Sequence, residues 1–291
     1  MNPEKEGTGG GVRAPRLLLR GIGDPHASDT RPGLRRADPR EKVRGATRLR
    51  WPAATPWRAA QAAFENALQR LYLAYQPIVA WPGGRLFGCE ALVRSRLPAM
   101  ARAGDLLRAA RSLGRVRDLG RAVRRRALGA LARLPEPVLL FVNLHADELE
   151  DPLLARCAHA HLRRRIVLEI HEEARLEGRP DLVRRLRELR RMGYRLALDD
   201  VGAGGRGIPA VSMVRPDVVK LDASLVRGVD RDGARLEAVR HIQRVCDQNG
   251  AVLICEGVES AAERNALWLS GCVLFQGFLF GRPHRRLPRL A

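Results

Sequence analysis

The chain has 291 residues, enough for one large domain or two of average size with a buried core. It carries 52 basic and 32 acidic residues, a net charge of +20, and only 4% of it is aromatic. Such a charge attracts polyanions, but a solvated arginine-rich surface explains it more simply, so nucleic acid is disfavoured as a partner. No run of about 18 apolar residues could cross a membrane, and no signal-peptide core is present. Five cysteines without a CxxC pair are typical of a reducing compartment, so we expect a cytoplasmic protein.

The first 58 residues differ from the rest of the chain. They are rich in Gly, Pro and Arg and contain one short apolar patch, at 17–19. Such a segment cannot bury enough apolar surface to offset the entropy lost on ordering. We therefore predict a disordered, basic N-terminal tail over 1–58 and a folded domain over 59–291, beginning with a helix at 59–71.

Beyond the tail, short β-rich runs alternate with longer amphipathic stretches. We predict strands at 71–79, 86–94, 138–145, 165–172, 195–200, 218–222, 251–259 and 273–280. Helices are predicted at 118–134, 180–193 and 232–250, where Gly193 and Gly250 suit the C-terminal caps of the last two. Eight strands alternating with helices predict an α/β fold, a (β/α)8 TIM-like barrel. The connection at 80–85 is too short for a crossover helix, so the first strand pair should be antiparallel.

Polar residues stand near the ends of seven predicted strands. They are Glu90, Asn143, Glu169, Asp199, Asp200, Lys220, Glu256 and Gln276. In a barrel the C-terminal strand ends converge on one site. A single glutamate in such a place is usually a salt-bridged structural residue, but the repetition in successive strands predicts an acidic pocket that holds one lysine.

Lys220 is unusual in this composition, because the chain has 49 arginines and only three lysines, and no other lysine follows residue 42. A compact ammonium with three donors fits one point among several carboxylates, whereas the planar guanidinium fork of arginine does not. Chance retention is the alternative explanation. The position at a strand end favours a functional lysine.

The predicted pocket has the chemistry of a metal site. Five carboxylates and a side-chain amide form a hard oxygen cluster, which suits Mg²⁺ or Mn²⁺. The adjacent Asp199 and Asp200 can approach two metal positions, and two metals roughly 3.5–4 Å apart suit an in-line phosphoryl displacement. His171-Glu172 does not begin an HExxH zinc motif, because no second histidine follows, and neither a GxSxG elbow nor a P-loop is present.

The sequence around these residues resembles the EAL domain family, the cyclic di-GMP phosphodiesterases of bacteria. The matching segments are YQPIV (75–79), EALVR (90–94), FVNL (141–144), LEIHE (168–172), LALDDVGAG (196–204), PDVVKLD (216–222), CEGVE (255–259) and QGFLFGRP (276–283). The resemblance covers about 70–286. It implies hydrolysis of cyclic di-GMP to linear pGpG in second-messenger signalling, with two Mg²⁺ or Mn²⁺ ions in each active site, and it implies a homodimer.

The resemblance also assigns roles. Residues that match the metal ligands are Glu90, Asn143, Glu169 and Asp199, with Asp200 at the second metal. Lys220 matches the lysine that holds or activates the attacking water, and Glu256 a glutamate that acts as base or second-metal ligand. Residues that match the substrate groove are Gln76, Leu92 and Arg94. Supporting roles around the site fall to Glu172, Asp222, Glu259 and Gln276.

The loop at 201–207 departs from the family pattern. Val201, Ala203 and Gly205 stand where an aromatic, a hydroxyl residue and a tyrosine are usual, and His171 stands where Thr or Ser is usual. We therefore expect a slow enzyme, or one that needs a high metal concentration. The alternatives are a non-catalytic cyclic di-GMP receptor that acts through a protein partner, and a nucleic-acid-binding protein with strongly salt-dependent affinity. The complete ligand set favours the enzyme.

Overall fold

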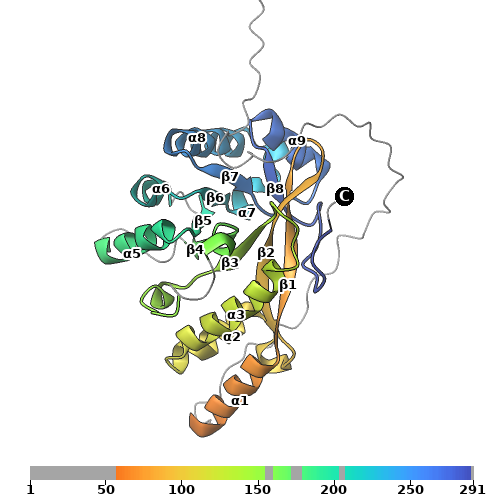
Figure 1. Ribbon diagram of the computed structural model, residues 1–291. Helices are drawn as coiled ribbons and strands as arrows, with labels where there is room; N and C mark the ends of the chain where they lie inside the picture. The colour runs from red at the N-terminus through yellow and green to blue at the C-terminus, as the bar shows by residue number, and fades with distance from the viewer. Residues whose placement is uncertain (1–56, 155–159, 172–178, 203–206, 290–291) are drawn as a thin grey trace, which may run out of the picture.

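The computed structural model describes residues 57–154, 160–171, 179–202 and 207–289. Eight strands form a closed barrel in chain order (Figure 1). The strands are β1 Leu71–Ala80, β2 Arg85–Ser95, β3 Leu139–Asn143, β4 Ile166–His171, β5 Arg195–Val201, β6 Val218–Leu221, β7 Val252–Cys255 and β8 Leu274–Gln276. The predicted (β/α)8 barrel is confirmed.

Strand β1 runs against the direction of the rest of the barrel. It is antiparallel to both of its neighbours, β2 and β8, whereas every other neighbouring pair is parallel. The long β1–β2 hairpin closes through a turn in which Gly83 and Gly84 have φ of 102° and 65°, which favour glycine. The predicted antiparallel first pair is confirmed, and the short turn is its cause.

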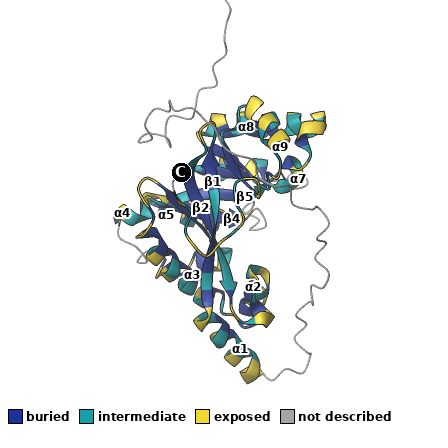
Figure 2. Ribbon diagram, turned by 90° about the vertical axis from the view of Figure 1, so that its right-hand side faces the viewer, coloured by how far each residue is buried: buried dark blue, intermediate teal, exposed yellow. Residues whose placement is uncertain are grey.

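Helices surround the barrel. They are α1 Trp57–Gln69, α2 Ala103–Ser112, α3 Val116–Leu131, α4 Ala160–Arg163, α5 Pro180–Arg191, α6 Ile208–Val214, α7 Ala223–Val226, α8 Gly233–Asn249 and α9 Ala261–Leu269. Short 3-10 turns lie at η1 Pro98–Met100, η2 Ala146–Glu148 and η5 Val229–Arg231. Figure 2 shows the buried strands in the middle and the exposed faces of the helices outside. The predicted helices are present, and their ends differ from the predicted ones by at most three residues.

Two apolar layers hold the barrel together. The outer layer lies between the strands and the helices, and the inner one fills the barrel. The inner layer is formed by Ile78, Ala80, Phe87, Leu139, Phe141, Val167, Ala197, Val218, Val252, Ile254 and Leu274. Alternate residues of each strand point to opposite faces, so every strand contributes to both layers. Burial of these side chains is the main favourable term in folding.

The caps of α8 follow the sequence signals. The Asp232 side chain accepts hydrogen bonds from the backbone of Ala234 and Arg235 at 3.0 and 3.1 Å, and Gly250 ends the helix with φ 69°. Gly193 follows α5 with φ 101°. Both glycines stand where only a residue without a Cβ adopts the left-handed conformation easily.

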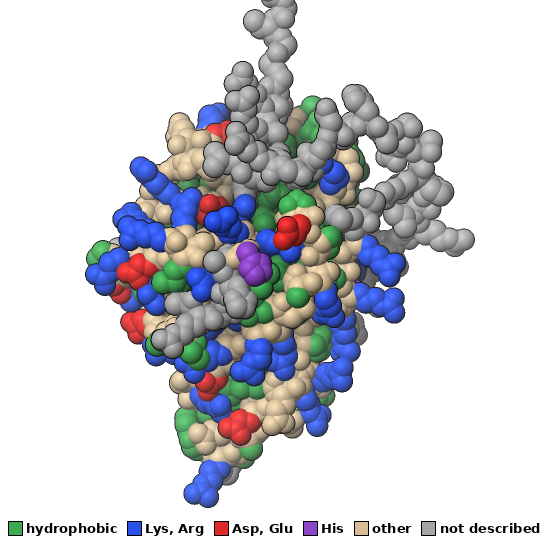
Figure 3. Space-filling view, in the orientation of Figure 1, with side chains coloured by type: hydrophobic (Ala, Val, Ile, Leu, Met, Phe, Trp, Pro, Cys, Tyr) green, Lys and Arg blue, Asp and Glu red, His purple; other side chains and the backbone are tan. Residues whose placement is uncertain are grey.

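None of the described helices is long and apolar enough to cross a bilayer. The described cysteines are buried free thiols: Cys89, Cys246, Cys255 and Cys272. Basic side chains are spread over the face seen in Figure 3, with acidic ones among them. The predicted homodimer and the predicted cytoplasmic location stay predictions.

Residues 1–56 lie outside the described part of the chain, so the disordered tail and its boundary at 58 also stay predictions. We expect deletion of 1–56 to change the melting temperature by no more than about 2 °C, because the core begins within α1. A matched deletion of 1–69 also removes Phe64, which is fully buried, and should lower the melting temperature by roughly 10 °C. Equal melting temperatures for the two truncated proteins would contradict this boundary; thermal unfolding followed by circular dichroism measures both.

Candidate active site

Polar side chains replace apolar ones at the carboxyl end of the barrel. In β4, Val167 belongs to the inner layer and Glu169 follows two residues later; in β5, Ala197 is followed by Asp199. The same step leads from Phe141 to Asn143, from Val218 to Lys220, from Ile254 to Glu256 and from Leu274 to Gln276. Because side chains two residues apart share a face of the strand, these residues all point inward. Together they form a polar layer above the apolar interior.

The hairpin contributes two more residues to this layer. Gln76 stands opposite Glu90 in the β1–β2 register, and Ile78 stands opposite Gly88. A Cβ at Gly88 would lie 2.8 Å from the ring of Phe141, so glycine allows β2 and β3 to pack closely here. Glu90 is thus placed directly above a tightly filled interior.

A local irregularity directs two adjacent aspartates to one site. The β5–β6 register shifts between Leu198 and Val201, and Asp200 has φ 59°, in the left-handed region. The Asp200 backbone N–H donates to Asp199 Oδ1 at 3.1 Å. In a regular strand the two side chains would face opposite sides, so the bulge is what brings both carboxylates to the barrel end.

Lys220 is the centre of the polar layer. Its side chain is 1% exposed, and its Nζ lies 2.6 Å from Glu169 Oε1 and 2.6 Å from Glu256 Oε1. Asp199 Oδ1 is 3.3 Å from the same nitrogen and Glu90 Oε2 is 3.4 Å from it. The predicted acidic pocket with one ammonium inside it is therefore formed by strands β2, β4, β5 and β6 and by the loop after β7.

Acidic side chains outnumber basic ones around this ammonium. Burial by itself lowers the pKa of Lys220, but the carboxylates, with Asp199 first, outweigh it and hold the pKa well above its ordinary range. Burial raises the pKa of Asp199, moves that of Glu169 well above its usual range and raises that of Glu256 to about 8. The pKa of Glu90 is lowered, because Lys220 and two neighbouring amides offset its burial. One ammonium does not balance so many acids.

Amide side chains orient Glu90. Its Oε2 accepts from Gln276 Nε2 at 2.6 Å, and its Oε1 accepts from Asn143 Nδ2 at 3.2 Å. Gln276 Nε2 also donates to Gln76 Oε1 at 3.3 Å, and Gln76 Nε2 donates to the Gly281 carbonyl at 3.2 Å. This chain of hydrogen bonds fixes a carboxylate in the way that supporting residues fix metal ligands.

His171 belongs to the site, although the sequence analysis gave it no role there. It lies two residues beyond Glu169 in β4, so the two side chains share a face. Its Nε2 is 2.7 Å from Asn143 Oδ1, and its Nδ1 is 3.1 Å from Asp200 Oδ2. The hydrogen bond to Asp200 raises the pKa of His171 and lowers that of Asp200. The spacing from Glu169 was the signal that could have identified it.

The residues at the barrel end fit a divalent cation. Gln276 Oε1 is buried and accepts no hydrogen bond from any of the described residues, whereas the buried Glu169 Oε1 lies 2.6 Å from Lys220 Nζ. Ligand atoms of His171, Asp199 and Asp200 all lie within 4.8 Å of one another. The donors are mainly carboxylate and amide oxygens, which suit hard cations, and added positive charge would relieve the excess of acids.

The predicted groove residues continue outward from Glu90. Leu92 and Arg94 follow it at alternate positions of β2, so they share its face and lead away from the pocket toward the rim. Both are half-buried. Arg94 Nη1 donates to the Val93 carbonyl at 2.8 Å, which holds the guanidinium along the strand.

The other predicted supporting residues lie further from the pocket. Asp222 caps α7 by accepting from the backbone N–H of Ser224 at 2.8 Å. Glu259 is exposed and accepts from Arg227 Nη2 at 3.1 Å, outside the carboxylate cluster. Glu172 lies outside the described residues. The functional parts assigned to these three stay predictions.

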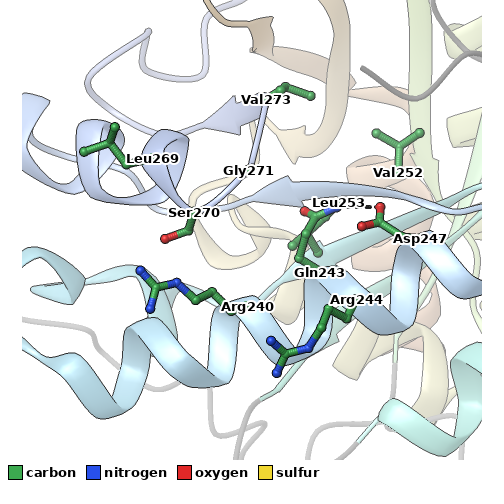
Figure 4. A pocket seen from close by; sticks show the side chains of 10 residues that line it. All are labelled: Arg240, Gln243, Arg244, Asp247, Val252, Leu253, Leu269, Ser270, Gly271 and Val273. Carbon is green, nitrogen blue, oxygen red and sulfur yellow. Dashed lines mark hydrogen bonds between the residues drawn. The ribbon is translucent and has the colours of Figure 1, made fainter. Parts of the chain in front are cut away.

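A hollow of about 480 Å³ lies at the opposite end of the barrel (Figure 4). It is lined by the second half of α8, which carries Arg240 and Arg244, by the first residues of β7, and by the segment that leads from the end of α9 to Val273, just before β8. Arg244 pairs with Glu237 at 3.2 Å. None of the predicted site residues lines it, so variants here serve as controls for the polar layer.

Comparison with known proteins identifies the family. Residues 57–283 match the EAL domain, well over half of the chain. The chain belongs to the EAL domain family. The resemblance inferred from the motifs is therefore confirmed.

Named relatives of this EAL domain include signalling proteins and phosphodiesterases. An uncharacterized signaling protein of Caulobacter vibrioides is 31% identical over 73% of this chain and 27% of its own length. The cyclic di-GMP phosphodiesterase RocR of Pseudomonas aeruginosa is 30% identical over 72% of this chain and 56% of its own. The chain thus spans between about a quarter and just over half of these relatives.

Solved structures of EAL proteins have a similar fold. The PaMucR phosphodiesterase in complex with c-di-GMP superposes with a TM-score of 0.68, at 26% identity, over 77% of this chain and 97% of that one. A calcium/cy-diGMP complex of Klebsiella pneumoniae BlrP1 has a TM-score of 0.67 and 29% identity, over 76% of this chain and 58% of that one. Both neighbours share the barrel of this EAL domain.

The charge balance at Lys220 generates a stability prediction. Lys220→Met leaves several buried carboxylates without their cation, which should cost about 3–5 kcal/mol of unfolding free energy at pH 8.5 in EDTA. An acid whose pKa is raised in the folded state binds more protons in the folded protein than in the unfolded one. Its destabilising effect on the folded state therefore decreases as the pH falls. The variant should therefore regain stability between pH 8.5 and pH 5.5, as measured by thermal melting.

Two comparisons complete this experiment. Arg240→Met, at the opposite end of the barrel, removes one cation from the surface and should leave the melting temperature nearly unchanged at both pH values. A Lys220→Met protein as stable as the wild type at pH 8.5 would show that the ammonium does not hold the carboxylates together.

Proposed function

We propose that this EAL domain hydrolyses cyclic di-GMP to linear pGpG with the help of two divalent cations, Mg²⁺ or Mn²⁺. One observation carries the proposal: a buried lysine contacts four carboxylates, from Glu90, Glu169, Asp199 and Glu256, at the carboxyl end of the barrel. The phosphodiesterases among its relatives and the c-di-GMP complexes among its structural neighbours support the choice of substrate.

The reaction is a displacement at phosphorus. The oxygen of a water molecule forms a bond to one phosphorus of the ring, and the bond from that phosphorus to the ribose 3′ oxygen breaks. One proton of the water leaves during attack, and a proton is supplied to the departing 3′ oxygen. The product is a linear dinucleotide with a 5′-phosphate and a free 3′ hydroxyl.

The cations would be held by residues of the polar layer. At the first position these are Glu90, Asn143, Glu169 and Asp199, and Asp200 stands at the second. When bound, such cations withdraw charge from the phosphate and make a water molecule more acidic. The residues are preorganised for this task, since Glu90 is oriented by two amides and Glu169 is held between Lys220 Nζ, 2.6 Å from its Oε1, and Asn143 Nδ2, which donates to its Oε2 at 3.2 Å.

Lys220 and Glu256 act on the water. The Lys220 ammonium is fixed by short contacts to Glu169 and Glu256, so it can donate to the water oxygen from a defined point. The Glu256 side chain is 17% exposed, whereas the other three carboxylates around the ammonium are at most 9% exposed. Glu256 is therefore the carboxylate most open to the groove, and it is the one placed to accept the proton of the water.

The groove residues bind the dinucleotide. Gln76, Leu92 and Arg94 lie along the hairpin on the face that carries Glu90. Arg94 offers a planar set of donors to a phosphate oxygen pair, while Leu92 provides apolar contact for a base or ribose. The extended hairpin thus aligns the ring with the polar layer, which is the positioning that catalysis requires.

The metal dependence tests the proposal. The protein is incubated with cyclic di-GMP and Mg²⁺, Mn²⁺, Ca²⁺ or EDTA, and the nucleotides are separated by chromatography. We expect pGpG with Mg²⁺ and Mn²⁺, none with EDTA, and little with Ca²⁺ because of its longer and looser coordination. Intact cyclic di-GMP that is nevertheless bound tightly would indicate a receptor instead. Equal turnover in EDTA would refute the role of the cations.

The identity of the lysine gives a second test. Lys220→Arg keeps the charge but replaces a compact ammonium with a planar fork, so hydrolysis should fall by at least about 100-fold. Affinity for cyclic di-GMP should stay within a few-fold, because Lys220 contacts carboxylates and not the groove. The control is the reverse exchange Arg240→Lys at the other end of the barrel, which should leave turnover unchanged. An active Lys220→Arg protein would show that charge alone suffices.

The rate of turnover depends on the loop after Asp200. Residues 203–206 of this loop lie outside the described residues, so the slow rate or high metal requirement expected from the sequence stays a prediction. Val201, which stands where the family usually has an aromatic residue, is buried in the outer apolar layer. The departure at this position therefore concerns core packing and leaves the carboxylates of the site intact.

A further inference from the structure

One residue of the site can offer a nitrogen ligand to a metal ion. His171 is the nitrogen donor among carboxylates and amides, and it lies at the mouth of the pocket with its side chain 48% exposed. Its position at the end of β4 is fixed by the strand, since it stands beside Asp199 in the β4–β5 register. A rigid strand end holds the ring in a defined place.

The imidazole faces the oxygens of three neighbours. Its Nδ1 lies 3.1 Å from Asp200 Oδ2 and 3.5 Å from Asp199 Oδ2, and its Nε2 lies 2.7 Å from Asn143 Oδ1. Each of His171, Asp199 and Asp200 has one potential ligand atom, and these three atoms all lie within 4.8 Å of one another. This is the spacing at which separate side chains share a single ion.

Ligand type decides which ion such a site prefers. Carboxylate and amide oxygens suit Mg²⁺, Ca²⁺ and Mn²⁺, whereas imidazole suits first-row transition metals, and affinity for a mixed nitrogen and oxygen site rises from Mn²⁺ toward Co²⁺ and beyond. Mg²⁺ gains least from a nitrogen ligand, because it is a hard cation that retains its waters.

We propose that His171 is a direct ligand, with Asp199 and Asp200, of one divalent cation, and that its nitrogen makes this position select Mn²⁺ and Co²⁺ over Mg²⁺. This inference rests on the metal site of the proposed function but not on turnover. It makes the second cation position of this EAL domain a transition-metal site.

A competing role for His171 is that of a brace. In that case the ring donates to Asn143 Oδ1 and Asp200 Oδ2 and orients them without contacting the ion. The two roles differ in one observable. A ligand nitrogen couples magnetically to bound Mn²⁺, whereas the nitrogen of a brace lies too far away for strong coupling.

The test uses the full chain, freed of metal and without nucleotide. Mn²⁺ binding is titrated by the loss of the free-ion electron paramagnetic resonance signal, and Mg²⁺ affinity is measured by competition. Pulsed resonance spectroscopy of the bound Mn²⁺ detects directly coordinated nitrogen. We expect a nitrogen coupling in the wild type that His171→Thr abolishes, with Mn²⁺ affinity lowered by about 10–100-fold and Mg²⁺ affinity changed much less.

The control variant is His241→Thr, which removes an exposed histidine from the surface of α8 and should keep both the coupling and the affinities. His171→Asn provides a second replacement that retains a polar side chain of similar reach. If either His171 variant melts below the temperature of measurement, the other one and the wild-type spectrum decide.

The outcomes separate the two proposals. Mn²⁺ that binds without nitrogen coupling, or a ratio of Mn²⁺ to Mg²⁺ affinity that is unchanged in both His171 variants, overturns the role of His171 as ligand. Failure of the protein to bind Mn²⁺ at all overturns it as well. Nitrogen coupling in a protein that does not hydrolyse cyclic di-GMP supports the inference while the proposed phosphodiesterase activity fails.

Discussion

The ammonium of Lys220 is the interaction on which the end of the barrel depends. Four carboxylates within 3.4 Å of one nitrogen would repel one another in a site from which water is nearly excluded. Burying the ions is costly, and only close contacts of opposite charge offset that cost. The lysine therefore keeps the acids together while the excess of negative charge remains available to attract metal cations. Stability and the affinity for cations have the same electrostatic origin here.

The strands convert this charge cluster into a shaped site. Along a strand, an inward-facing apolar residue is followed two residues later by an inward-facing polar one. The cluster therefore forms a single layer directly above the apolar interior. The reversed strand β1 extends the layer sideways, because Gln76 meets Gln276 on one side and faces Glu90 on the other. The bulge at Asp200 breaks the alternation once. A non-glycine residue in the left-handed region costs roughly 1–2 kcal/mol, and such strain is commonly found at functional sites.

In the proposed role as a metal ligand, His171 would change the chemistry of the site without changing its scaffold. The ring occupies an inward position that the strand offers in any case, and it meets oxygens that are already held by other contacts. The metal preference of an otherwise hard oxygen site can therefore be altered by one side chain at the rim. This kind of change leaves the fold untouched, because the exposed end of a strand carries little of the apolar core.

The sequence by itself determined most of the architecture and most of the site. Alternation of strand-like and helix-like segments predicted eight strands, the short link at 80–85 predicted the reversed first pair, and the isolated Lys220 indicated the centre of the pocket. These signals are local, since period-two alternation and turn length act within a few residues. Strand ends were less well predicted: β7 ends at Cys255, four residues before the predicted end, because Glu256 already belongs to the loop.

The tertiary structure alone decided three other features. The left-handed conformation of Asp200 depends on the register between β5 and β6, so the pair Asp199-Asp200 could not be oriented from the sequence. The contacts of His171 join residues from three strands, which only the parallel pairing of β3, β4 and β5 brings within hydrogen-bond distance. Glu259, in the loop after β7, accepts a hydrogen bond from Arg227, a contact between distant segments that no local pattern indicates. Local patterns specify which face of a strand a side chain occupies, whereas the neighbours it meets there are set by the pairing of distant segments.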